Sequence, residues 1–471
     1  MRTDQNSSVP SRRSAASPLC ADPRSSVDSR LHPESQRDAG PPGSGLTGSK
    51  KAASPTRRLL LAASLANLPF GTIYAFSVLL KPIESLLGLQ RTDLTLVFAL
   101  ATIVLTVGMN LAPVLYRRIP VHMLLGGAAA LSAAGLLMTA VAQSRLHLLL
   151  GYSVLFGLGA GVVFTTVQHM VNQADLTRRG LVNGYVVSLY PLGAMLGAPL
   201  MGWSIGEIGL RATLLALAGT LGASLLGAAW LLRTSHAATH ARQGMQDAIE
   251  AGTRPHDRVM PGQGGTSART VASPSPARGG LFLCLASIFT LAASAGLMVM
   301  SQAAGIMQAY GAGLGAALAA TTFMTGAIAL ARILGGWLVD RFAVHHVMAA
   351  AQLWALVGAA LLSVWPTATA ALPGLTMIGM GYGLISGASA AAIGQWWPMA
   401  QFGLIAGRLY IGWCVAAISL PLVAARLYDA SGTYNTAILL AGGFNTVAML
   451  VALRLGRVAD AAPGQPKTPR A

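Results

Sequence analysis

The stretch Ala329–Phe342, ALARILGGWLVDRF, places an arginine inside a run of apolar residues that reads as a membrane-buried helix. In hydrocarbon, an ionised guanidinium costs at least about 2.5–3.5 kcal/mol by insertion scales. Charged residues at that depth face other helices or a water-filled cavity, and they usually mark a functional site. Arg332 is therefore the first candidate for a functional residue in this sequence.

The position of Arg332 narrows its roles to two. Asp340 stands at the expected end of the helix, eight residues after Arg332. At 1.5 Å per residue, the two positions are about 12 Å apart along the helix. That is farther than the side chain comfortably reaches to the membrane surface. Apart from Asp93 at the very start of one span, the expected spans hold no acidic residue to pair with Arg332. Its five N–H donors either grip an arriving carboxylate or bond carbonyls and hydroxyls between packed helices.

The composition indicates an integral membrane protein. Of the 471 residues 54% are hydrophobic and 10% are charged, and the mean hydropathy is +0.58, whereas soluble proteins carry about 25% charged residues. The net charge of +17 would favour nucleic acid if Lys and Arg formed one face, but most lie in the tails and between apolar runs. Three scattered cysteines suit neither a disulfide framework nor a zinc site. We expect no nucleic acid, metal or cofactor.

Twelve apolar runs are long enough to cross a bilayer, which takes about 20 residues of helix. They predict an all-α integral membrane protein with a six-helix half over 59–232 and another over 279–456. We expect a disordered cytoplasmic tail over 1–58, a central cytoplasmic loop over 233–278 and a second cytoplasmic tail over 457–471. The expected spans are 59–80, 92–115, 121–142, 147–168, 180–203, 210–232, 279–303, 314–339, 345–364, 370–394, 402–424 and 434–456.

The distribution of Lys and Arg predicts the orientation, because these residues concentrate in cytoplasmic segments. With the N-terminus inside, the inner segments hold 26 of the 32 basic residues, the outer loops hold five, and the remaining one is Arg332. The short loops alone are nearly balanced, so this prediction depends on the N-terminal tail and the central loop. We expect a multi-pass protein of the inner (plasma) membrane with both termini cytoplasmic.

The two halves repeat short motifs at a nearly constant separation. GLVNG at Gly180–Gly184 corresponds to GLIAG at Gly403–Gly407 at an offset of 223 residues, and Tyr116 corresponds to Asp340 at an offset of 224. Parallel six-helix repeats are typical of a large class of transporters whose substrate site lies between the halves, near the middle of the bilayer.

On the basis of these motifs, the sequence resembles the major facilitator superfamily over roughly residues 59–456. GGWLVDRF at 335–342 is similar to the family's basic loop after the second helix of each half, and LYRRI at 115–119 looks like a diverged copy that lacks the usual Asp. The resemblance implies the major facilitator fold and a gate at the inner end of the eighth helix, formed by Asp340 and Arg341. A solvated surface pair, which contributes little, is the alternative for these two residues.

Within the superfamily, the sequence resembles the oxalate/formate antiporter-like branch. The first helix, FGTIYAFSVLLKPIESLLGLQRTDLTLVFAL at 70–100, and the eleventh-helix region, FGLIAGRLYIGWCVAAISLPLVAARLYDASGTYNTA at 402–437, carry this resemblance. It implies that Arg332 is the arginine that binds the substrate carboxylate. Trp413 stands where the oxalate transporters have a lysine as a second cation. The tenth helix, ISGASAAAIGQ at 385–395, offers Ala and Ser where they have aromatic residues. The loss of one cation favours a monoanion over oxalate.

Three tyrosines are further candidates for the same site, namely Tyr74 in the first helix and Tyr185 and Tyr190 in the fifth. Tyrosine combines an apolar ring with one hydroxyl, which suits a small organic anion. Ordinary packing or anchoring at the membrane surface is the alternative. The glycines of GLGAG at 157–161 and GMGYG at 379–383 are interpreted as sites of close helix packing, because no strand precedes either motif.

Together these features predict a secondary active transporter of a small organic anion, not an enzyme. An unpaired Arg332 would oppose closure of the empty carrier, whereas a bound carboxylate neutralises it, and this favours exchange of one anion for another. A proton-coupled monocarboxylate symporter is the alternative, with Glu84 and His169 as the nearest titratable groups, although a local hydrogen bond also explains His169. A multidrug or metabolite exporter of the same fold is a further alternative. We expect a monomer whose partners are its substrate and the lipid bilayer.

Overall fold

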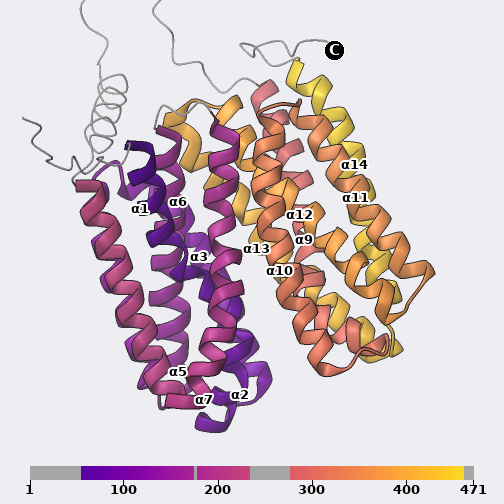
Figure 1. Cartoon of the computed structure of the whole chain (residues 1–471). Coiled ribbons are helices and arrows are strands. Elements are labelled where there is room, and N and C mark those ends of the chain that lie inside the picture. Colours follow the sequence, from indigo (N-terminus) through magenta and orange to yellow (C-terminus); the bar gives the residue numbers. More distant parts are fainter. Residues whose placement is uncertain (1–54, 174–177, 234–275, 461–471) are drawn as a thin grey trace, which may run out of the picture. The chain divides into compact units, whose positions relative to one another are not determined.

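The computed structural model describes residues 55–173, 178–233 and 276–460, and within these ranges the chain forms helices joined by short turns (Figure 1). Ten of the described helices are long and apolar enough to cross a membrane, and one bent pair would add another. The helix α7 (Arg179–Arg233) covers two of the predicted spans, joined at Gly209, where φ is 82°. All twelve predicted runs therefore fall on described helices, and the predicted fold class is confirmed.

The bounds of the elements follow the apolar runs closely. Besides α7, the first half contains α1 (Pro55–Asn67), η1 (Pro69–Ala75), α2 (Ser77–Leu87), α3 (Arg91–Leu115), α4 (Val121–Ala140), α5 (Arg145–Leu148), η2 (Leu149–Phe156) and α6 (Gly157–Gln173). The second half contains α9 (Pro276–Ala309), α10 (Leu314–Val339), α11 (Val344–Val364), α12 (Ala368–Trp396), η3 (Met399–Gln401), α13 (Phe402–Ser431) and α14 (Asn435–Asp460).

The predicted tails and central loop fall mainly outside the described residues. Only 55–58, 233, 276–278 and 457–460 of these segments are described, and they are helical. The predictions of a disordered N-terminal tail over 1–58, a cytoplasmic loop over 233–278 and a tail over 457–471 stay predictions.

The first predicted span is not one continuous α-helix. Pro69 has no backbone N–H to donate, so α1 ends at Asn67 and the chain continues as the 3₁₀-helix η1, before bending by 59° into α2. Gly71 of η1 packs directly on the backbone of α7, where a Cβ would collide with Gly193. This close approach holds the following turn, which carries Tyr74, beside α7.

Polar and apolar side chains are distributed as a bilayer requires. Large apolar side chains such as Trp203 and Leu283 are 65% and 66% exposed, whereas Arg332 and Gln168 are 3% and 1% exposed. In water such an apolar surface would promote association, whereas in a bilayer it faces the hydrocarbon and the polar groups lie inside the bundle.

Glycines of α7 bring the two halves into backbone contact. Gly180 and Gly184 pack against α10, where a Cβ on Gly184 would collide with the carbonyl of Arg332 and one on Gly180 with Gly336. We call the end of the bundle where α3 and α10 end and α7 and α13 begin the Asp340 end. At this end the described halves are in direct contact.

A second contact of the same kind joins α13 to α3. Gly403 and Gly407 of α13 pack against the side chains of Tyr116 and Asn110, and the amide of Asn110 donates a 2.9 Å hydrogen bond to the carbonyl of Gly407. The two glycine motifs of the sequence repeat thus make corresponding contacts in the two halves, with Tyr116 taking the place that Asp340 has in the other copy.

Candidate functional site

Arg332 lies on α10 with its backbone held between two helices. The glycines Gly184 of α7 and Gly387 of α12 pack against its carbonyl. One terminal nitrogen of the guanidinium donates a 2.9 Å hydrogen bond to the carbonyl of Val187 in the first half, and the other donates a 3.0 Å bond to the hydroxyl of Tyr382. Its Nε is buried and has no hydrogen-bond partner among the described residues.

Arg332 also has no acidic partner within the part of the chain that the structure describes. An ion pair found there joins Arg145 to Asp93 at 2.8 Å, on the surface. The charge of Arg332 is instead surrounded by neutral groups: the ring of Tyr382 lies 5.3 Å from its central carbon, and the hydroxyls of Tyr74 and Tyr410 are close enough to interact with it. A buried cation without a counter-ion is a site to which an anion can bind.

Tyr382 connects Arg332 to Trp413. Its hydroxyl oxygen accepts a 2.9 Å hydrogen bond from the indole nitrogen of Trp413 in addition to the bond from Arg332. A phenol oxygen has two lone pairs and one hydrogen, so both acceptor positions are used and the hydrogen is left to donate. No described residue accepts it in a hydrogen bond. Nε of the guanidinium and this hydroxyl therefore each have a hydrogen left to donate.

Aromatic rings from both halves surround this pair. Tyr74 lies 6.1 Å from Trp413 and 6.0 Å from Tyr190, measured between ring centroids. Phe164 of α6 lies 5.0 Å from Tyr190 and 5.1 Å from Tyr410 of α13. We call Arg332 and these rings, together with Tyr382 and Phe289, the aromatic cluster. Tyr74 is partly exposed, while every other member is buried.

The structure thus brings four of the five predicted site residues together: Arg332, Tyr74, Tyr190 and Trp413. Tyr190 contributes its ring, because its hydroxyl donates a 2.8 Å hydrogen bond to the carbonyl of Ala160. The fifth, Tyr185, makes a different contact. Its hydroxyl shares a 2.6 Å hydrogen bond with Ser64 of α1, and the described contacts do not join it to the aromatic cluster.

The stretch ISGASAAAIGQ at 385–395 offers Ala and Ser as expected, but the same helix carries an aromatic residue shortly before it. Tyr382, in the GMGYG motif of α12, supplies an aromatic ring directly at Arg332. The sequence contained a signal for it, since Tyr382 is the sole aromatic residue in 368–395 and lies midway along the helix. The motif was interpreted as a helix-packing site because of its glycines, and its tyrosine was therefore missed. Tyr410, Phe164 and Phe289 were missed because aromatic residues in a span more often pack than bind.

The two predicted gate residues, Asp340 and Arg341, make different contacts. The two carboxylate oxygens of Asp340 each accept a 2.8 Å hydrogen bond, one from the backbone N–H of Gly180 and one from that of Leu181. Asp340 of the second half therefore caps the first turn of α7 in the first half, where the helix dipole favours a negative charge. The guanidinium of Arg341 lies 4.2 Å from the ring of Trp337 on its own helix.

We expect Asp340→Asn to weaken this contact, because the amide loses the charge and one of the two acceptors. Contributions of a helix cap and of a charge at a helix N-terminus are about 0.5–2 kcal/mol, which predicts about twofold to thirtyfold faster hydrogen exchange at Gly180 and Leu181. Mass spectrometry of peptides that cover 178–184 measures this. Asp93→Asn, which removes the surface pair with Arg145, is the matched control. Equal exchange in both variants would show that Asp340 does not hold the two halves together.

His169 lies near the Asp340 end of α6, beside Tyr116. Their rings stack with centroids 4.1 Å apart, and Nε2 of His169 lies 2.9 Å from the amide nitrogen of Gln173 on the same helix. These are the local contacts of a packed histidine, and none of them reaches Arg332.

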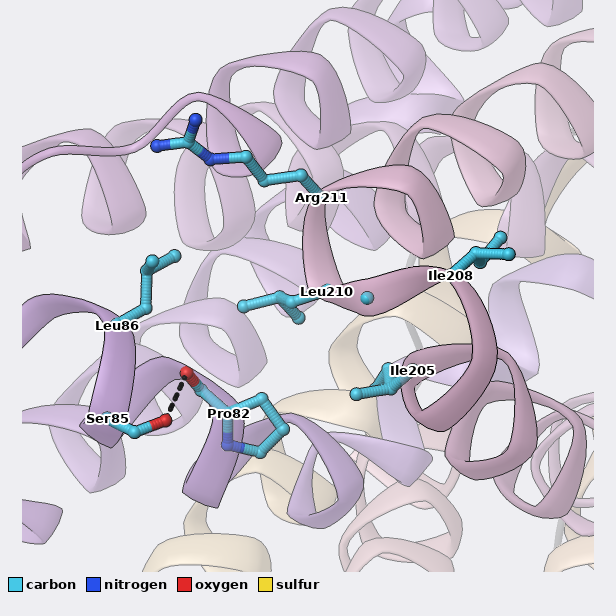
Figure 2. A pocket seen from close by; sticks show the side chains of 8 residues that line it. Pro82, Ser85, Leu86, Ile205, Ile208, Leu210 and Arg211 are labelled. Carbon is cyan, nitrogen blue, oxygen red and sulfur yellow. Dashed lines mark hydrogen bonds between the residues drawn. The ribbon is translucent and has the colours of Figure 1, made fainter.

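A separate pocket of about 500 Å³ opens at the other end of the bundle (Figure 2). Its walls are mostly apolar and come from α2 and from the turn of α7 around Gly209, with Arg211 extending along one side. The residues that line it are Pro82, Ser85, Leu86, Ile205, Ile208, Gly209, Leu210 and Arg211. It shares no residue with the aromatic cluster and belongs to the first half alone.

Several solved structures share this fold. The proton:xylose symporter XylE bound to 6-bromo-6-deoxy-D-glucose aligns with a TM-score of 0.66 and 15% identity, covering 85% of this chain and 96% of that one. The transporter FucP in the outward conformation aligns with a TM-score of 0.56 and 16% identity, covering 86% and 99%. At these identities the likeness is one of fold alone. The curated proteins include no match to this chain.

The sequence itself matches a family model. The model of the Major Facilitator Superfamily covers residues 59–282 and 282–471, which includes the described helices of both halves except for the first four residues of α1. The order of helices, the contact between the halves at the Asp340 end and this match agree with one another. The chain belongs to the Major Facilitator Superfamily.

Proposed function

We propose that this transporter carries a small monocarboxylate across the membrane by exchange, as the resemblance to the oxalate/formate antiporter-like branch implies. The observation that carries the proposal is Arg332, a cation that is 3% exposed, bonded to both halves, and without an acidic partner among the described residues. A carboxylate is the ligand that completes such a site, because it accepts parallel hydrogen bonds from a guanidinium.

The alternative role for Arg332 is to hold helices together, and its bonds to Val187 and Tyr382 are of that kind. Two features favour a ligand in addition. Nε of Arg332 has no partner in the part of the chain that the structure describes, although burying an unpaired donor costs about 1–3 kcal/mol. The hydroxyl of Tyr382 accepts two bonds and still has its hydrogen to donate. One carboxylate could accept from both groups.

The surroundings of Arg332 favour a ligand with a single charge. The aromatic cluster contains no second cation, and Trp413 uses its indole N–H on Tyr382. Rings that bury apolar surface beside one cation suit an organic acid with one carboxylate and a small apolar body. A second ionised carboxylate would be buried there without a counter-charge, which is unfavourable.

The same arrangement supports exchange. Transporters of this fold rock one half against the other around a central site, and Arg332 bonds across the two halves through Val187. When the site is empty, closure of both ends would enclose an uncompensated charge, whereas a bound carboxylate neutralises it. We place the protein in the plasma membrane with both termini cytoplasmic, so that the Asp340 end faces the cytoplasm.

Uptake by purified protein in liposomes tests this proposal. We expect labelled monocarboxylates to enter quickly when the vesicles contain unlabelled acid and slowly when they contain none, after subtraction of passive diffusion into protein-free vesicles. An imposed pH gradient should add little. Fast uptake into anion-free vesicles that requires an inward proton gradient would instead establish the symport alternative, and no saturable uptake of any acid would refute both.

A further inference from the structure

The side-chain nitrogen of a buried amide next to the aromatic cluster has no hydrogen-bond partner among the described residues. Gln168 of α6 is 1% exposed, and its Nε2 donates to no described group. An amide nitrogen carries two N–H donors, and leaving them unpaired in the protein interior is costly. The proposed role of Arg332 makes no use of this group.

Gln168 faces the second half through Tyr410. The hydroxyl of Tyr410 lies beside the side chains of Gln168 and Ser386, and it also interacts with the charge of Arg332. Phe164, one helical turn before Gln168, contacts the ring of Tyr410 at 5.1 Å. Three neutral polar groups from α6, α12 and α13 therefore lie together, close to the cation.

We propose that Gln168, with Tyr410 and Ser386, forms a neutral subsite that binds a hydroxyl or oxo oxygen of the substrate. This rests on the proposed carboxylate site at Arg332 and specifies its ligand as a hydroxy- or oxo-substituted monocarboxylate. An amide offers both donors and an acceptor, and hydroxyl groups do the same, so the subsite matches an uncharged oxygen. A second carboxylate is a poor match, because the cluster has one cation.

Pairs of acids that differ in one oxygen test this inference. Calorimetric titration of the purified full chain would compare lactate with propionate, and 3-hydroxybutyrate with butyrate. We expect the hydroxy acid of at least one pair to bind about twofold to tenfold more tightly, the range for one neutral hydrogen bond. Gln168→Met, which keeps the length of the side chain, should abolish this preference. Gln308→Met, at an exposed position of α9, should change neither.

The outcomes separate the subsite from the carboxylate site. Equal binding of both acids in both pairs by the unaltered protein would overturn the subsite while leaving the proposed function intact, and this comparison needs no variant to fold. A preference that persists in Gln168→Met would also overturn it. Binding of none of the four acids would refute the proposed function as well.

Discussion

Replacing Arg332 by glutamine is expected to abolish binding of monocarboxylates and, with it, exchange. The variant removes the cation of the site and its fork of parallel donors, leaving a neutral amide near the hydroxyl of Tyr382. Loss of one partner from a buried hydrogen-bonded charge pair costs about 2–5 kcal/mol, which corresponds to a weakening of at least about 30-fold in affinity. Thermal-shift titration of the purified protein with small carboxylates measures it.

Two further variants make this result specific. Arg332→Lys keeps the charge but loses the planar fork, so we expect binding of intermediate strength. Arg454→Gln makes the same chemical change at an exposed position of α14 and should leave binding unchanged. If Arg332→Gln is stabilised by the same acids to the same extent as the unaltered protein, then Arg332 holds helices together and the anion binds elsewhere or not at all.

Replacing Gly184 by valine is expected to prevent closure of the Asp340 end. A Cβ at this position would overlap the carbonyl of Arg332 and lie 3.0 Å from the Cα of Ile333. Both are backbone atoms of α10, so the overlap can be relieved only if the whole helix moves. Overpacking in protein interiors costs about 1–3 kcal/mol, which shifts a two-state equilibrium by about 5- to 150-fold. Exchange requires both conformations, so transport should fall by a similar factor.

A distance between the two halves reports this change directly. Arg118 and Phe342 are exposed and follow α3 and α10 at the Asp340 end. Spin labels on cysteines at these positions, with the three native cysteines replaced by alanine, should show a longer distance in Gly184→Val. Gly219→Val changes a glycine of the same helix that has no neighbour within 4 Å and should leave the distance as it was. An unchanged distance in both variants would mean that α7 and α10 do not separate at this point.

The contrast between Arg332 and Tyr382 shows how far the site could be predicted from the sequence. Arg332 was found because a charge in an apolar run is costly and needs a reason. Tyr382 was missed because a tyrosine in such a run costs little, and its role depends on which face of α12 meets α10. Tyr185 and Tyr190 illustrate the same limit: they lie five residues apart on one helix, yet one contacts Ser64 of α1 and the other contacts Tyr74.

The sequence by itself determined which segments are membrane helices, that they form an all-α protein, and that one arginine, Arg332, lies deep in an apolar run. These properties depend on local composition, because the cost of placing a residue in hydrocarbon is set by its own chemistry and its neighbours along the chain. Only the tertiary structure decided which side chains meet Arg332, that Asp340 caps α7, and that Gln168 lies beside Tyr410. Those contacts depend on the rotation and tilt of each helix, which are set by glycine packing between segments about 150 to 300 residues apart, as with Gly184 on Arg332 and Asn110 on Gly407.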